Sequence, residues 1–278
     1  MKTLLTTLLV GLLVWQPLRS SQGVVPITER YAVADDGTPL TWQAFLVPGG
    51  GVHPNVLIIH GGGFNGNEDG LQQLVCAQDL VAAGMNAFII AYRLAPPGRI
   101  PGQVSNGRYP EQTNDVHLAV RAARQDPRGN GKVGAVGGSA GGSHTVYVAA
   151  TGTPGDDQID AGVSLSGAYN FGDTASWSWQ GGYFFSSVSN YVGATDAKTL
   201  TAASPIAFIK APMSPLLLYA SADESMPPQQ ITDLIAQLNS VRAKNYQQTV
   251  YSGHGHAFAY WSKISPDVIE FLLDVLAK

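Results

Sequence analysis

The chain has 278 residues, of which 45% are hydrophobic and 13% charged, and its formal net charge is −4. This length and apolar content are enough for one large hydrophobic core, and they suit a single α/β domain at least as well as two small ones. The scarcity of lysine and arginine excludes the basic surface that nucleic-acid binding needs, so we expect no nucleic-acid partner.

The first residues have the layout of a secretory signal. Lys2 precedes an uncharged and largely apolar run at residues 4–15, and Arg19 follows the run. The run is shorter than the ~20 residues that cross a bilayer. We therefore expect residues 1–23 to be a signal peptide that directs secretion to the periplasm or the extracellular space, with no stable membrane insertion after signal cleavage. The alternatives are an uncleaved membrane anchor and a poorly ordered tail.

Beyond this segment, strand-like and helix-like patterns alternate. Residues 29–46 alternate apolar and polar positions around the turn sequence DDGT at residues 35–38, which predicts an antiparallel hairpin. Short, nearly all-apolar runs then predict strands that are buried on both faces, and the segments between them have helical spacing. The predicted strands are residues 55–60, 86–93, 132–136, 161–166, 215–220 and 246–252. The predicted helices are residues 71–84, about 110–125, a segment after Ser139, 229–241 and 266–277.

This order predicts an α/β fold with a mostly parallel central sheet and helices on both faces. Ligands bind such sheets beyond the carboxyl ends of the strands. Two segments interrupt the alternation, namely a loop rich in glycine and proline at residues 95–110 and an aromatic segment at about residues 169–200. Long loops are often functional, and the aromatic content argues against disorder. We expect residues 24–278 to form one catalytic domain that carries the aromatic segment as a lid-like insertion.

A G-x-S-x-G pattern at residues 137–141 lies between a predicted strand and a predicted helix. Its composition alone has little weight in a chain with 32 glycines. Its position gives it meaning, because the glycines permit a sharp turn that projects Ser139 at the carboxyl edge of the sheet. The N-terminus of the following helix favours developing negative charge there. We therefore predict that Ser139 is a catalytic nucleophile.

The sequence HGGGF at residues 60–64 directly follows the first all-apolar strand. Acyl transfer passes through a tetrahedral oxyanion, which backbone N–H groups can stabilise. Consecutive glycines can turn their amides toward a ligand without obstruction by side chains. We predict an oxyanion hole made by the amides of Gly62, Gly63 and Ala140, and we expect His60 to brace the loop.

A serine nucleophile needs a base, and the base needs an acid that orients it. We interpret His53, His117 and His144 as surface or packing residues. His254 and His256 follow the last predicted strand, which is where the base belongs when the chain order is Ser, acid, His. The same pair could instead bind a metal ion. No further Cys, His or acidic cluster completes such a site, so we expect no metal and no cofactor.

Five segments together resemble the α/β-hydrolase esterases related to hormone-sensitive lipase. They are HGGGF at 60–64, YRLAP at 92–96, GGSAGG at 137–142, SPIAFI at 204–209 and SGHGHAF at 252–258. GGSAGG is similar to the branch that includes bacterial acetyl-xylan and feruloyl esterases and arylformamidases. The family places its base in a Gly-His-x-Phe context, so the resemblance favours His256 over His254. The sequence departs from the hormone-sensitive group at Gly138, where that group usually has Asp, and in the loosened segment after YRLAP.

The resemblance also bears on the acid. Asp223 follows a buried strand in LLLYASADESMPPQQ and precedes a helix-like run, which is similar to the family's pattern of Asp before a Pro and Gln turn. We predict that Asp223 accepts a hydrogen bond from the imidazole and stabilises the imidazolium. Glu224 is the nearest competitor.

These residues predict a secreted serine carboxylesterase that cleaves short-chain, acetyl or aryl esters through an acyl-enzyme intermediate. The expected partner is a small-molecule or carbohydrate ester, and no oligomeric state is predicted. Amide or peptide hydrolysis, as in arylformamidases or serine peptidases of this fold, is one alternative. A non-catalytic ligand-binding protein with a hydrolase fold is the other. The residues expected to bind substrate are Phe64, Trp177, Trp179 and Tyr183. Packing of the insertion onto the core explains its aromatic rings equally well.

Overall fold

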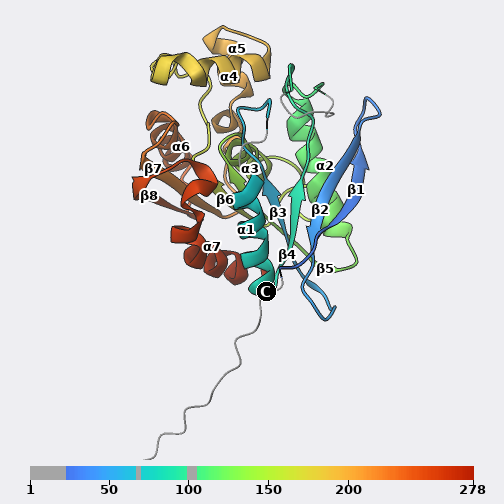
Figure 1. The fold of residues 1–278 in the computed structure, drawn as a ribbon. Helices are drawn as coiled ribbons and strands as arrows, with labels where there is room; N and C mark the ends of the chain where they lie inside the picture. The colour runs from blue at the N-terminus through green and yellow to red at the C-terminus, as the bar shows by residue number, and fades with distance from the viewer. Residues whose placement is uncertain (1–22, 67–69, 99–104) are drawn as a thin grey trace, which may run out of the picture.

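The computed structural model of the chain describes residues 23–66, 70–98 and 105–278. The predicted signal peptide at residues 1–23 lies outside this part of the chain except for its last residue. In the described residues, eight strands form one sheet (Figure 1). They are β1 (Ile27–Val33), β2 (Pro39–Phe45), β3 (His53–Ile59), β4 (Asn86–Ile90), β5 (Gly129–Gly138), β6 (Ala161–Leu165), β7 (Leu216–Asp223) and β8 (Tyr246–His254).

The strands follow the order β1-β2-β4-β3-β5-β6-β7-β8 across the sheet. The pairs β1–β2 and β2–β4 are antiparallel, and the pairs from β4–β3 to β7–β8 are parallel. The β1–β2 hairpin forms one edge of the sheet and β8 forms the other. The predicted hairpin and the mostly parallel sheet are both confirmed.

Helices cover both faces of this sheet. On one face, α1 (Gly70–Ala82) and α7 (Trp261–Leu276) enclose a core that includes Leu80 and Val268. On the other face, α2 (Glu111–Gln125), α3 (Ala140–Ala150) and α6 (Gln229–Ser240) enclose a core that includes Val120 and Leu234. The two cores confirm the predicted α/β layering. None of the helices in the described part of the chain combines the length and the apolar character needed to cross a membrane.

The aromatic insertion forms a separate layer above the sheet (Figure 1). It contains a short 3-10 turn, η1 (Trp179–Gly182), and the helices α4 (Tyr183–Val192) and α5 (Ala197–Ala203). Its buried residues form a third apolar cluster with residues of the sheet's carboxyl edge, among them Phe64, Ala140 and Ala168. The insertion therefore covers the edge at which the sequence predicts the site. A second 3-10 turn, η2 (Pro205–Phe208), follows α5, and a third, η3 (Ala257–Tyr260), precedes α7.

The last helix begins earlier than the sequence pattern predicts. The prediction places Pro266 at its start, whereas α7 begins at Trp261 and contains Pro266. Trp261, Ile264 and Val268 are all buried, and their spacing of three and four positions continues the apolar stripe of the helix upstream of the proline. Packing of Trp261 against the core therefore sets the start of the helix.

The sequence leaves two interpretations open for Arg93 and Asp115, a buried ion pair or two unrelated surface charges. The structure shows the buried pair. The Arg93 guanidinium donates to the Asp115 carboxylate from Nε at 3.0 Å and from Nη2 at 2.8 Å, and both side chains are buried. Burial raises the pKa of Asp115, while the guanidinium opposes that rise. The pair links the end of β4 to α2.

Replacing Asp115 with alanine is expected to lower the free energy of unfolding by about 3 kcal/mol, because it leaves the buried guanidinium without its carboxylate. Exposed Asp35, whose carboxylate lies 2.6 Å from Arg93, compensates only in part. Urea denaturation followed by circular dichroism measures the change. Asp156→Ala serves as the control. It breaks the solvent-exposed pair of Asp156 with Arg121 and should leave the unfolding midpoint nearly unchanged. Equal effects of the two substitutions would contradict this prediction.

Candidate active site

Ser139 occupies a sharp turn between β5 and α3, as the sequence predicts. Its backbone has φ 54° and ψ −118°, a conformation that side-chain-bearing residues rarely adopt. The turn is held by the Ser139 amide, which donates to the Leu165 carbonyl at the end of β6 at 2.8 Å. Such backbone strain costs roughly 1–3 kcal/mol and concentrates at functional sites. The neighbouring strand thus fixes Ser139 at the carboxyl edge of the sheet.

Gly138 allows the loop that follows β8 to approach this turn. A Cβ atom at residue 138 would lie 2.7 Å from the Phe258 ring and 2.9 Å from the Ala257 Cβ atom. Any side chain at residue 138 would therefore push away the segment that directly follows His256. This contact explains the departure from the hormone-sensitive group, because an aspartate at this position does not fit the present packing.

His256 is paired with Glu224. Its Nδ1 atom lies 2.7 Å from Glu224 Oε2, and the Glu224 side chain is only 5% exposed. The other carboxylate oxygen of Glu224 accepts a hydrogen bond from the Ser221 amide at 2.7 Å. Because a carboxylate can only accept, Nδ1 carries the proton, and Nε2 of the neutral ring has a free lone pair. The pair therefore holds the imidazole in the tautomer that a general base requires.

Asp223, the predicted acid, does not contact His256. Its carboxylate lies 2.7 Å from Nδ1 of His254, and the two side chains are 75% and 88% exposed. Asp223 and His254 are register partners on β7 and β8, after a shift in register between Ser221 and Asp223. β7 ends at Asp223, whose side chain faces solvent, and the chain bends at Glu224, whose side chain turns inward to His256. The structure replaces Asp223 with Glu224 as the partner of His256.

Ser139 and His256 line the same cavity. It has a volume of about 40 Å³, and Gly63 and Ala140 contribute to its wall. The predicted nucleophile, the predicted base and two of the three predicted oxyanion donors therefore meet at one place. Gly62, the third predicted donor, precedes Gly63 in the same loop but is not among the residues that line the cavity.

The loop after β3 is held in an unusual backbone conformation. Gly62, Gly63 and Phe64 have φ values of 109°, 58° and 65°, all in the range that favours glycine. The carbonyl of Phe64 accepts hydrogen bonds from the Ala95 amide at 2.8 Å and from the Gln112 side chain at 2.7 Å. These two bonds keep the strained residue in place, and with it the loop beside Ser139.

Two other histidines near the site are structural. Burial lowers the pKa of His60 to about 4 and that of His144 to about 3, so both rings are neutral at pH 7. The His60 ring stacks on Tyr92 with 4.1 Å between the ring centroids, and its Nδ1 atom lies 2.8 Å from the Gly61 carbonyl. His60 therefore braces the glycine loop, as predicted.

The aromatic insertion contributes to the cavity through α4 rather than through its tryptophans. Phe64 and Tyr183 line the cavity, as predicted, whereas Trp177 and Trp179 are not among its lining residues. The Trp177 indole donates to the Phe171 carbonyl at 3.0 Å, and its ring packs against Phe185 within the insertion. The substrate-binding role predicted for the two tryptophans is therefore not supported by their positions.

Trp179 instead attaches the insertion to the loop that carries Glu224. Its indole N–H donates to the Ser225 carbonyl at 2.9 Å. The neighbouring Gln180 side chain donates to the Glu224 carbonyl at 3.3 Å. Tyr183 reaches the other side of the cavity, since a Cβ atom at Gly63 would lie 2.9 Å from the Tyr183 hydroxyl. The insertion thus contacts both the glycine loop and the acid loop.

Sequence reasoning missed several residues of the site. Phe184 and Val188 lie one helical turn apart on α4, a spacing from which their shared face could have been inferred. Ala168, Met226 and Pro227 follow strand ends, but nothing in their residue types marks them as part of a site. The lining residues that were not predicted are Ala168, Phe184, Ser187, Val188, Ser225, Met226 and Pro227.

Solved structures with similar folds include several esterases. A truncated form of a carbohydrate esterase from gut microbiota has a TM-score of 0.73 at 16% identity, covering 92% of this chain and 99% of its own. A thermophilic esterase, Est2 from the planctomycete Thermogutta terrifontis, has a TM-score of 0.67 at 16% identity, covering 90% of this chain and 92% of its own. The same enzyme phosphorylated by paraoxon has a TM-score of 0.70 at 17% identity, covering 94% and 99%. At these identities the matches establish a shared α/β-hydrolase fold.

No curated protein matches the chain. The BD-FAE family model matches residues 48–238, which is more than half of the 278 residues. The matched range includes Ser139 and Glu224 and ends before His256. The chain therefore belongs to the BD-FAE family.

Proposed function

We propose that this protein is a serine carboxylesterase that hydrolyses short-chain esters through an acyl-enzyme intermediate. Ser139 is the nucleophile, His256 the general base and Glu224 the acid that orients the base. The observation that carries the proposal is the 2.7 Å contact between His256 Nδ1 and the buried carboxylate of Glu224, at a histidine that lines the same cavity as Ser139. No other histidine in the described residues both lines that cavity and contacts a carboxylate.

The reaction follows from this arrangement. Nε2 of His256 takes the proton from the Ser139 hydroxyl as its oxygen attacks the ester carbonyl, and Glu224 stabilises the resulting imidazolium. The amides of Gly63 and Ala140 stabilise the oxyanion. The imidazolium then gives its proton to the departing alcohol, and the acyl group remains on Ser139. Water, activated by the same histidine, releases the acid and restores the enzyme.

The volume of the cavity points to a short acyl group. A cavity needs ~10–15 Å³ to hold one water molecule, so a cavity of about 40 Å³ holds only a few heavy atoms. An aryl or sugar alcohol is much larger and must extend toward solvent. The carbohydrate esterase among the similar structures supports an acetyl or aryl carboxylic ester of a carbohydrate as the natural substrate. The basic and apolar pattern of the first residues supports export as part of the same proposal.

An organophosphate tests the nucleophile directly. Incubation with paraoxon should transfer its diethylphosphoryl group to Ser139 and release p-nitrophenol, and peptide mass spectrometry should locate the adduct on the peptide that contains residue 139. The Ser139→Ala variant should carry no adduct. Turnover of p-nitrophenyl acetate together with the matched anilide separates ester from amide hydrolysis. A labelled residue other than Ser139, or faster turnover of the anilide, would contradict the proposal.

A further inference from the structure

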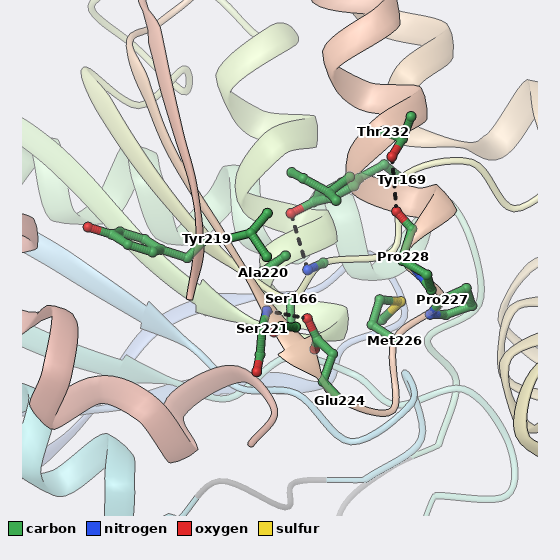
Figure 2. A pocket seen from close by; sticks show the side chains of 14 residues that line it. Ser166, Tyr169, Tyr219, Ala220, Ser221, Glu224, Met226, Pro227, Pro228 and Thr232 are labelled. Atoms are coloured by element: carbon green, nitrogen blue, oxygen red, sulfur yellow. Dashed lines mark hydrogen bonds between the residues drawn. The ribbon is translucent and has the colours of Figure 1, made fainter. Parts of the chain in front are cut away.

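A second and larger cavity lies beside the candidate active site. It has a volume of about 180 Å³, more than four times that of the cavity around Ser139. It lies between the carboxyl end of β7, the start of α6 and the loop that follows β6. In Figure 2, Glu224, Met226 and Pro227 lie at its lower end, and Tyr169 and Thr232 at its upper end. Glu224 is the one member of the candidate triad that lines this space, and neither Ser139, His256 nor the glycine loop after β3 contributes to its lining.

The polar side chains around this second cavity already have partners within the protein. The Tyr169 hydroxyl bonds to Ser164 at 2.8 Å, and the Ser221 hydroxyl donates to the Gly253 carbonyl at 2.7 Å. The Ser166 hydroxyl bonds to Tyr260 at 2.8 Å. Because of these bonds, the three hydroxyl groups do not need a hydrogen-bond partner in the cavity. Its remaining surface is apolar and is formed by Ala220, Ala222, Met226, Pro227, Pro228, Ile231 and Val250.

Met226 and Pro227 line both cavities. They therefore form a wall between the space beside Ser139 and the larger apolar space. Pro227 is rigid, whereas the Met226 side chain is unbranched and has three rotatable bonds. Truncating that side chain shortens the wall and leaves Ser139, His256 and Glu224 unchanged.

The orientation of a bound ester determines whether this wall limits the length of the acyl chain. The alcohol part of a p-nitrophenyl or sugar ester does not fit into about 40 Å³, so the acyl part enters the cavity and the alcohol remains outside. An acyl chain that grows beyond a few carbons then needs space beyond the cavity wall. The adjoining space at Met226 is apolar, as an alkyl chain requires.

We propose that Met226 limits the acyl chain length of the substrate and that the cavity behind it is a latent site for a longer alkyl chain. The inference rests on the proposed esterase function. In the native protein, Met226 closes the end of the acyl site and restricts the enzyme to short acyl groups. When its side chain is truncated, the two cavities join, and the distal carbons of a medium-length chain occupy the larger one.

The test compares p-nitrophenyl acetate, butyrate, hexanoate and octanoate as substrates. The native protein is expected to lose kcat/KM steeply beyond butyrate. Met226→Ala is expected to raise the ratio of kcat/KM for hexanoate to that for acetate by about tenfold or more, since each methylene group that gains an apolar pocket is worth about that factor. The ratio does not depend on the fraction of folded enzyme or on a uniform loss of rate.

Two further variants test whether the acyl chain of the substrate occupies the second cavity. Met226→Leu keeps the volume of the wall and is expected to retain the native profile. Val250→Phe places a large ring at the mouth of the second cavity, at a position that is 55% exposed and therefore tolerant of substitution. Combined with Met226→Ala, it is expected to remove the gain for hexanoate.

The outcomes separate this inference from the function on which it rests. Absence of ester hydrolysis by the native protein overturns the proposed function and this inference with it. Acetate hydrolysis combined with an unchanged hexanoate ratio in Met226→Ala overturns the role of Met226 alone. The same holds if the native protein hydrolyses hexanoate as fast as acetate, or if the gain survives Val250→Phe.

Discussion

Replacing Ser139 with alanine is expected to lower kcat for p-nitrophenyl acetate by roughly 10⁴- to 10⁶-fold, while the protein stays folded. In the proposed mechanism the substitution removes the oxygen that forms the acyl-enzyme bond, and what remains is the background catalysis of the oxyanion donors and substrate binding. Steady-state kinetics measures the loss, and thermal unfolding followed by circular dichroism shows whether the fold is retained.

Ser187 provides a matched control for this experiment. It lies on α4 and lines the same cavity as Ser139, but it is not at the strand-to-helix turn. Ser187→Ala is expected to change kcat by less than about tenfold, because it removes only a polar contact in the wall. If the Ser139→Ala variant kept a tenth of the native activity, Ser139 would not be the nucleophile.

Replacing Glu224 with glutamine is expected to lower kcat by roughly 10³- to 10⁴-fold, whereas Asp223→Asn should lower it by less than about threefold. Glutamine removes the negative charge beside Nδ1 of His256, so the imidazolium loses its stabilisation and the ring can adopt the wrong tautomer. The Asp223 carboxylate is paired with the exposed His254 instead. Kinetics with p-nitrophenyl acetate for both variants measures the difference.

The two substitutions are chemically equivalent and lie at adjacent positions, so each is the other's control. Both keep the volume of the side chain and both remove one negative charge near the site. If the two carboxylates acted on the reaction only through their negative charge, both substitutions would lower kcat by a similar factor. A larger loss in Asp223→Asn than in Glu224→Gln would restore the original prediction that Asp223 is the acid.

The choice between these two carboxylates shows what sequence alone can establish. The chain order of nucleophile, acid and base placed the acid at the end of β7, and the carboxylate that contacts His256 lies one residue further along the chain. One residue is nonetheless decisive, because β7 ends at Asp223 with an exposed side chain and the chain then bends at Glu224, whose side chain is buried. No residue type in the strand indicates where this bend lies.

The fold was more accessible to prediction than the site. Apolar runs and helical spacing depend on burial in the two cores, so they identified the elements of the sheet and most of its helices. Boundaries failed where packing overrides local signals, as at Trp261, which extends α7 upstream of Pro266. Residues such as Met226 and Ala168 have no chemical signature, and only the three-dimensional arrangement places them beside Ser139.

The contacts from Trp179 and Gln180 to the Ser225 and Glu224 carbonyls have a consequence for protein engineering. Transplanting the residue 169–200 segment from a relative, in order to import its substrate range, would also exchange the groups that hold the loop of Glu224, the proposed acid. Such chimeras should work only when the residue 223–228 turn is exchanged together with the segment. The two stretches, which are distant in the sequence, constitute a single module for recombination.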